Sequence, residues 1–210
     1  SVFALVDLYF VGHLKESAYA IQTVGLTESL LTIVYSISIG ISMAATAIIA
    51  RRIGEKKPEK ASESASQAII LSIIITIVLS VFAFIYAKDL LIWMGSSEAA
   101  AEYGKNFTKI MMASCISIVL LFLINGIFRG AGNAAIAMKS LWLANGINII
   151  LCPILIRGWF IFPEMGLEGA ALATAIGRSC GVVYQLYCLR KSNSLIRLRK
   201  AYFVPQVKLI

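Results

Sequence analysis

Charged residues are scarce in this chain of 210 residues. Asp, Glu, Lys and Arg make up 14% of the sequence, whereas about a quarter is usual for globular domains in water. The apolar share is 59% and the mean hydropathy is +0.84. This lack of charge excludes an ordinary water-soluble domain and indicates that hydrocarbon is the main solvent of the chain.

Histidine is almost absent, and His13 is the single one. The sequence has no HExxH motif, and its hydrophobic runs carry no paired aspartates, so it lacks the metal cluster or nucleophile–base pair that a membrane-embedded enzyme needs. We therefore expect no enzyme activity. Four cysteines lie inside hydrophobic runs without paired spacing, and we interpret them as small apolar fillers rather than a disulfide framework or a metal site. They are Cys115, Cys152, Cys180 and Cys188.

Hydrophobic runs follow one another along the chain, separated by short polar connections. A helix needs about 20 apolar residues to span a bilayer, and a span without water must be helical because its backbone groups have to be paired internally. We expect an all-α, polytopic membrane protein with six transmembrane helices. They cover residues 1–13, 19–50, 61–86, 108–128, 134–156 and 170–189. The first run is too short to span and has no initiator methionine, so we expect the chain to be a fragment.

The net charge of +8 is concentrated in the short connections, which is typical of topology signals and not of a nucleic-acid-binding face. We count 13 Lys and Arg residues on one expected side, including the cluster in residues 51–60, and 5 on the other. The positive-inside rule makes the richer side cytoplasmic. Residues 191–210 then form a cytoplasmic linker that leads towards a missing seventh helix.

Three ionisable residues fall inside the expected spans: Asp7, Glu28 and Arg178. Each costs about 2.5–3.5 kcal/mol on insertion scales and therefore needs a partner or a water-filled cavity. The helical rise places Asp7 roughly 10 Å and Glu28 roughly 13 Å below the outer boundary. Glu28 and Arg178 fit either an ion pair or a binding role. Asp7 has no basic residue near it in sequence, which favours reversible binding of a proton or Na⁺.

Polar residues of the last two expected helices converge on the same outer half. Asn148 and Cys152 are four residues apart and share a helix face. Thr174 and Arg178 have the same spacing on the following helix.

Five stretches carry a family resemblance: VDLYFVGHLKESAYAIQTVGL, SIGISMAATAIIARRIGEKK, FRGAGN, NIILCPILI and GLEGAALATAIGRS. Their order and spacing resemble the multidrug and toxic compound extrusion (MATE) family over essentially the whole chain. In that family twelve helices form two six-helix lobes around a central cavity that opens alternately to each side. The resemblance implies that residues 1–190 are the amino-terminal lobe.

The resemblance also implies a cation site in this lobe. The family's aspartate, asparagine and threonine match Asp7, Asn148 and Thr174. The sequence departs from the family at Cys152, where members with the fuller site carry a second aspartate. A thiol is a poor ligand for the hard Na⁺ ion, which favours proton coupling through Asp7. Glu28 lies at a depth that allows it to supply the missing carboxylate.

The sequence therefore predicts a secondary active multidrug exporter in the plasma membrane of a bacterium. An inward flux of H⁺ or Na⁺ would drive the release of amphipathic organic compounds, with no cofactor besides the coupling ion. The expected partners are the bilayer, the small organic substrates and a carboxyl-terminal lobe of the same polypeptide; nucleic acid is not expected. One alternative is a lipid-linked oligosaccharide flippase of related fold, although its cavity often carries several basic residues and only Arg178 is central here. Another is a half-size protein that acts as a dimer of lobes.

Overall fold

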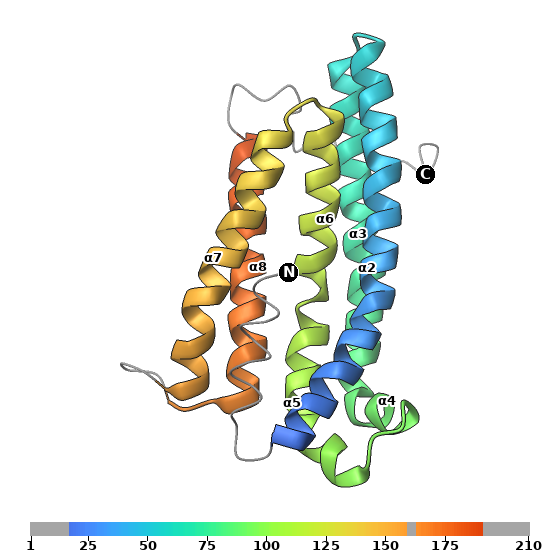
Figure 1. Ribbon diagram of the computed structural model, residues 1–210. Helices are drawn as coiled ribbons and strands as arrows, with labels where there is room; N and C mark the ends of the chain where they lie inside the picture. The colour runs from blue at the N-terminus through green and yellow to red at the C-terminus, as the bar shows by residue number, and fades with distance from the viewer. Residues whose placement is uncertain (1–16, 159–162, 191–210) are drawn as a thin grey trace.

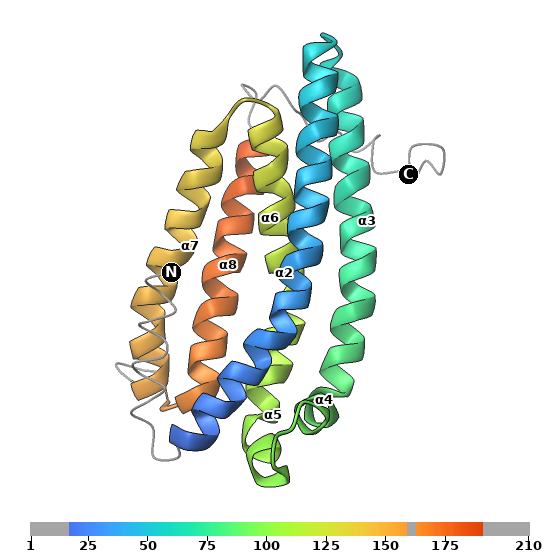
Figure 2. The same cartoon turned by 45° about the vertical axis from the view of Figure 1, so that its right-hand side comes forward.

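The computed structural model describes residues 17–158 and 163–190, which form α-helices joined by short connections, without a strand in these ranges. Figures 1 and 2 show the long helices running side by side, with α2 next to α3 and α7 next to α8. The expected all-α architecture is confirmed. The helices are α2 (Ser17–Gly54), α3 (Pro58–Ile85), α4 (Ala87–Trp93), α5 (Glu98–Ala113), α6 (Cys115–Gly130), α7 (Ala134–Arg157) and α8 (Gly166–Arg190). The expected first helix and the linker 191–210 lie outside the described residues.

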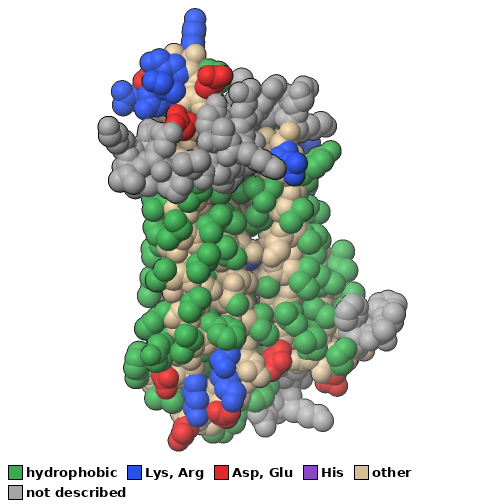
Figure 3. All heavy atoms as spheres, turned by 180° about the vertical axis from the view of Figure 1, so that it is seen from behind, with side chains coloured by type: hydrophobic (Ala, Val, Ile, Leu, Met, Phe, Trp, Pro, Cys, Tyr) green, Lys and Arg blue, Asp and Glu red, His purple; other side chains and the backbone are tan. Residues whose placement is uncertain are grey.

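Four helical stretches in the described part of the chain are long and apolar enough to cross a membrane. They are Ala18–Gly54, Pro58–Ile85, Glu98–Gly130 and Ala134–Arg157. The expected span at 170–189 falls within α8, which has 25 residues but carries the polar Arg178 and Gln185. Figure 3 shows a broad apolar band between two charged ends of the molecule. This distribution is the one a bilayer requires, with hydrocarbon against the band and water at both ends.

The largest difference from the expected helices lies before the fourth span. Residues 87–107 were expected to be a connection, but they form α4 and the first part of α5. The Oγ atom of Ser97 accepts a hydrogen bond from the N–H of Ala100 at 3.3 Å and so caps the start of α5. Only Ser114 separates α5 from α6. Residues 98–107 form an amphipathic helix because their small and apolar side chains face the bundle. These buried residues include Ala100, Ala101, Gly104 and Phe107.

A charged turn joins α2 to α3 at one end of the bundle. The Glu55 carboxylate accepts hydrogen bonds from Arg51 at 3.0 Å and from Lys57 at 3.2 Å. The hydrogen bond from the Arg51 guanidinium has the largest effect on the pKa of Glu55, and the bond from the Lys57 ammonium has the next largest. Both hold this pKa below its usual value. α4 lies at the opposite end (Figure 1), where Lys88 pairs with Glu102 at 3.1 Å. Among the described residues, the turn region 51–60 is rich in basic side chains, with Arg51, Arg52, Lys56, Lys57 and Lys60 against Glu55 and Glu59.

Glycines bring two helix pairs into close contact. A Cβ atom at Gly126 of α6 would lie 2.5 Å from the carbonyl oxygen of Ser42 on α2. A Cβ atom at Gly177 of α8 would lie 2.6 Å from the carbonyl oxygen of Ala144 on α7. Small residues at such crossings are the usual means of packing helices where lipid removes the hydrophobic drive between them. The described helices thus include a group with α2, α3 and α6 and a tightly packed pair, α7 and α8, and α5 contacts both groups.

The first prediction concerns topology. Lys57→Cys and Lys105→Cys should be labelled from opposite sides of the membrane, because the two residues lie at opposite ends of the bundle. A membrane-impermeant maleimide applied to intact cells should react with the cysteine at position 105. The cysteine at position 57 should react only after permeabilisation. Labelling of both positions from the same side would contradict the proposed orientation.

The second prediction concerns helix packing. Gly177→Ala should destabilise the lobe by about 1–3 kcal/mol, because the added methyl group must push α7 away from α8. Gly146→Ala is the matched control, since a Cβ at Gly146 meets no atom within 4 Å and alanine is the better helix former. SDS-induced unfolding, monitored by circular dichroism, measures the stability of the two variants. Equal stability of the two variants would refute the packing argument.

Candidate functional site

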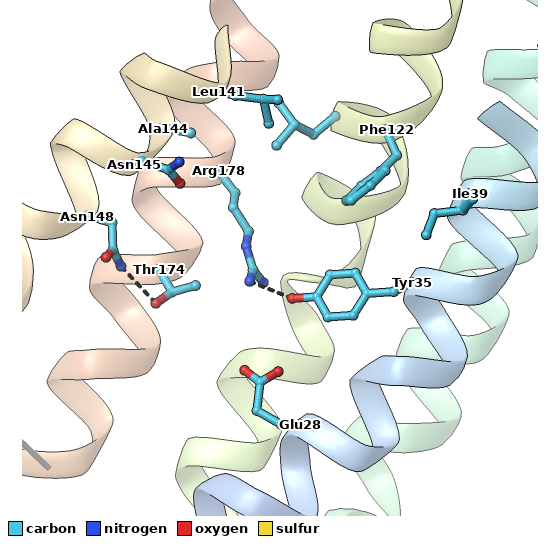
Figure 4. Close-up of a pocket in the computed structure, with 11 residues that line it drawn as sticks. Glu28, Tyr35, Ile39, Phe122, Leu141, Ala144, Asn145, Asn148, Thr174 and Arg178 are labelled. Atoms are coloured by element: carbon cyan, nitrogen blue, oxygen red, sulfur yellow. Dashed lines mark hydrogen bonds between the residues drawn. The ribbon is translucent and has the colours of Figure 1, made fainter. Parts of the chain in front are cut away.

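A cavity of about 420 Å³ lies between the two helix groups. α2 and α6 form one wall, and α7 and α8 form the other. Apolar and aromatic side chains make up part of the lining, and six polar side chains face the same space. Figure 4 shows most of them pointing inward from their helices. The lining residues are Glu28, Tyr35, Ile39, Leu121, Phe122, Leu141, Ala144, Asn145, Asn148, Thr174 and Arg178.

Asn148 and Thr174, two of the residues predicted for the cation site, are hydrogen-bonded to each other. The Nδ2 atom of Asn148 donates to the Oγ1 atom of Thr174 at 2.9 Å, and the Thr174 hydroxyl donates to the carbonyl oxygen of Ala170 at 3.0 Å. Both side chains are buried. The Oδ1 atom of Asn148 is also buried and finds no hydrogen-bond partner among the described residues. The pair therefore presents one unused acceptor oxygen.

This geometry depends on the close approach of α7 and α8. Gly177 lies three residues after Thr174 on α8, and a Cβ atom there would be 3.3 Å from both the Cβ and the backbone nitrogen of Asn148. A larger residue would separate the two backbones. Glycine at this position thus keeps the Asn148 amide within hydrogen-bond distance of the Thr174 hydroxyl.

Arg178 extends from α8 across the cavity towards α2. Its Nη2 atom donates to the phenolic oxygen of Tyr35 on α2 at 2.7 Å (Figure 4). The Tyr35 ring also lies against Phe122, with 6.0 Å between ring centroids. Sequence analysis did not single out Tyr35, although it lies two helical turns after Glu28 on the same face of α2. The contact joins residues 143 positions apart, so helical periodicity alone does not reveal it.

Glu28 lines the same cavity from α2. In Figure 4 its carboxylate lies below the Tyr35–Arg178 contact and points towards it. The cavity therefore contains both a carboxylate and a guanidinium, held on facing walls.

Cys152 has surroundings different from those of Asn148, although the two share a helix face. It is fully buried in a hydrophobic cluster with Leu155, Ile156 and Ala170, and it is not among the residues that line the cavity. Asp7 lies outside the described residues. The structure thus brings Asn148, Thr174, Glu28 and Arg178 to one cavity, and Cys152 is not among the residues that line it.

A second polar cluster joins α6, α7 and α8, and sequence analysis missed it. The Nε2 atom of Gln185 lies 2.7 Å from the Oδ1 atom of Asn125 and 3.0 Å from the Oγ atom of Ser140. The Ser140 hydroxyl is 3.1 Å from the same Asn125 oxygen. All three residues are buried. Single polar residues within apolar runs were the only signal for this cluster, and they do not reveal which helices meet.

Residues 1–154 match the family described as MatE. A probable multidrug resistance protein, NorM, from Thermotoga maritima is 30% identical over 98% of this chain and 44% of its own length. Two solved structures of multidrug resistance MATE family transporters, one inward-facing and one outward-facing, are 27% and 28% identical over 99% of this chain. Their TM-scores are 0.89 and 0.87, and the chain covers 46% and 45% of them. The chain therefore spans a little under half the length of these relatives.

Proposed function

The chain belongs to the MatE family, and from this premise we propose that it forms one lobe of a secondary active multidrug exporter. In this proposal, inward movement of a coupling cation drives outward release of amphipathic organic compounds. The observation that carries the proposal is the cavity between the α2–α6 and α7–α8 walls. Its lining combines aromatic and aliphatic surface with a few polar groups, which suits ligands with an apolar body and a polar group.

We assign the coupling site to Asp7, Asn148 and Thr174. The resemblance supplies Asp7, and the hydrogen bond between Asn148 and Thr174 supports the other two. The unused Oδ1 atom of Asn148 accepts a hydrogen bond from a protonated carboxyl group or contacts a cation. Protonation of Asp7 removes a charge from a medium of low dielectric constant. Because the charged and neutral forms favour different packing of the surrounding helices, binding of the proton shifts the lobe between two states.

The coupling ion is proposed to be a proton rather than Na⁺. Na⁺ is a hard cation and is held by several oxygen ligands. Cys152 offers sulfur in a hydrophobic cluster instead of a carboxylate at the cavity. The Thr174 hydroxyl already donates to Ala170 and accepts from Asn148. A single proton on one carboxyl group needs far fewer ligands than Na⁺ does.

Alternating access is proposed to arise from movement of this lobe against a second one. The chain spans less than half of its relatives, which supports a second lobe in the whole protein. Its similarity to both an inward-facing and an outward-facing transporter supports a lobe that moves largely as a rigid body. The flippase alternative is not proposed, because Arg178 alone is basic among the described residues of the cavity.

The third prediction tests the coupling site. Asp7→Asn in the whole transporter should abolish cation-driven efflux but leave membrane insertion intact, because asparagine keeps the size of the side chain and cannot cycle between charged and neutral forms. Cys152→Ala is the matched control and should change transport little, since the thiol packs among apolar side chains. Dye efflux from energised vesicles and the yield of folded protein measure the two effects. Wild-type efflux by Asp7→Asn, with unchanged pH dependence, would overturn the mechanism.

The fourth prediction tests the need for a second lobe. Residues 1–210 reconstituted alone should show no cation-driven dye efflux, because one lobe leaves the cavity without its opposing wall. Co-reconstitution with a second lobe should restore transport. Uphill transport by the monomeric 210-residue chain would contradict the two-lobe proposal.

A further inference from the structure

The guanidinium of Arg178 has hydrogen-bonding capacity that the structure leaves unused. A guanidinium carries five N–H donors in a fixed planar arrangement. The Nη2 atom donates to Tyr35 at 2.7 Å, whereas the Nη1 atom is buried and has no hydrogen-bond partner among the described residues. Figure 4 shows this group in the middle of the cavity, reaching from α8 towards α2.

Within the proposed export function, on which this step rests, we infer that Arg178 recognises an anionic group of the transported compound. The substrates of this chain are then amphiphiles that carry a carboxylate or phosphate in addition to their apolar body. A guanidinium binds such groups through two parallel N–H···O bonds. The Tyr35 hydroxyl fixes the guanidinium, and the rings of Tyr35 and Phe122 provide an adjacent apolar wall.

A purely structural role would leave part of the hydrogen-bonding capacity of Arg178 unused inside the cavity. A structural arginine in a membrane-spanning helix would be expected to satisfy its donors within the bundle, because an unpaired buried donor of a charged group is costly. The cavity instead holds two unused buried atoms of opposite kind, the Nη1 donor of Arg178 and the Oδ1 acceptor of Asn148. Both belong to residues that line the same cavity.

A pair of dyes that differ in one group tests this inference. Rhodamine B is a zwitterion with a free carboxylate, and its ethyl ester is a cation with nearly the same apolar body. Binding of each dye to the purified protein in lipid nanodiscs is followed by fluorescence anisotropy. Arg178→Gln should weaken binding of rhodamine B by about tenfold, the loss expected for a hydrogen bond to a charged group. Binding of the ester should be largely unchanged.

Two further variants separate recognition from folding. Arg178→Lys keeps the charge but loses the planar pair of donors, so its affinity for rhodamine B should lie between those of wild type and Arg178→Gln. Leu141→Ala removes apolar lining without touching the guanidinium and should weaken both dyes equally. If Arg178→Gln weakens both dyes equally, or neither of them, the inference is overturned and the export function still stands. If the wild-type protein binds neither dye and the whole transporter exports neither, the export function itself fails.

A competition arm distinguishes the source of the anionic group. Dilauroyl phosphatidic acid and dilauroyl phosphatidylcholine are each titrated against bound rhodamine B. Displacement by phosphatidic acid alone, lost in Arg178→Gln, supports the anion site and assigns it to a lipid headgroup. Failure of both lipids to displace the dye supports a soluble amphiphile. Equal displacement by both lipids, unchanged in Arg178→Gln, overturns anion recognition.

Discussion

The absence of water from the membrane core is the constraint on which the rest of this lobe depends. Every polar group there must find its partner within the protein. Hydroxyls do so in two ways. Some donate to the carbonyl one turn earlier, as Ser38 does to Val34. Others reach a neighbouring helix, as Ser42 does to the carbonyl of Phe122 and Ser80 to that of Met112. Such bonds fix which helices are neighbours, because apolar contact with another helix differs little from contact with lipid.

Some buried polar side chains in the described residues have an atom without a hydrogen-bond partner, and their positions differ. The side chains of Gln185, Asn125 and Ser140 are hydrogen-bonded to one another and hold α6, α7 and α8 together. Gln185, Asn148 and Arg178 each have one buried polar atom without a partner in the described residues. Asn148 and Arg178 differ from Gln185 because they line the cavity. Polar residues of similar burial thus fall into two kinds, one joining helices and one facing a space that a ligand can occupy.

Sequence reasoning succeeded where length and hydrophobicity decide the outcome. A long apolar run such as residues 61–86 can only become a spanning helix, and α3 occupies Pro58–Ile85. Reasoning failed before the fourth span, because residues 98–107 are amphipathic and their helix is stabilised by burial of Ala100 and Phe107 rather than by hydrophobicity along the run. Glu28 and Arg178 were found because charge in a span is costly, whereas Asn148 and Thr174 were found through helix spacing and the family resemblance. The Tyr35–Arg178 contact was not found, because it depends on which helices face each other.

The positions of the two polar pairs also suggest how a cation and a substrate can act on one another. Thr174 and Arg178 are one turn apart on α8, so the proposed coupling site and the proposed anion site share a single rigid element. Coupling requires that each ligand bind one state of the lobe more tightly than the other. The coupling free energy is the same whether the effect of the cation on the substrate or that of the substrate on the cation is measured. The close packing at Gly177 makes α8 move with α7, so the Asn148–Thr174 hydrogen bond is kept in such a movement. The same movement shifts the guanidinium of Arg178 relative to Tyr35 on α2. Gly177 therefore allows the hydrogen bond between Asn148 and Thr174 and also couples the movement of α7 to that of α8.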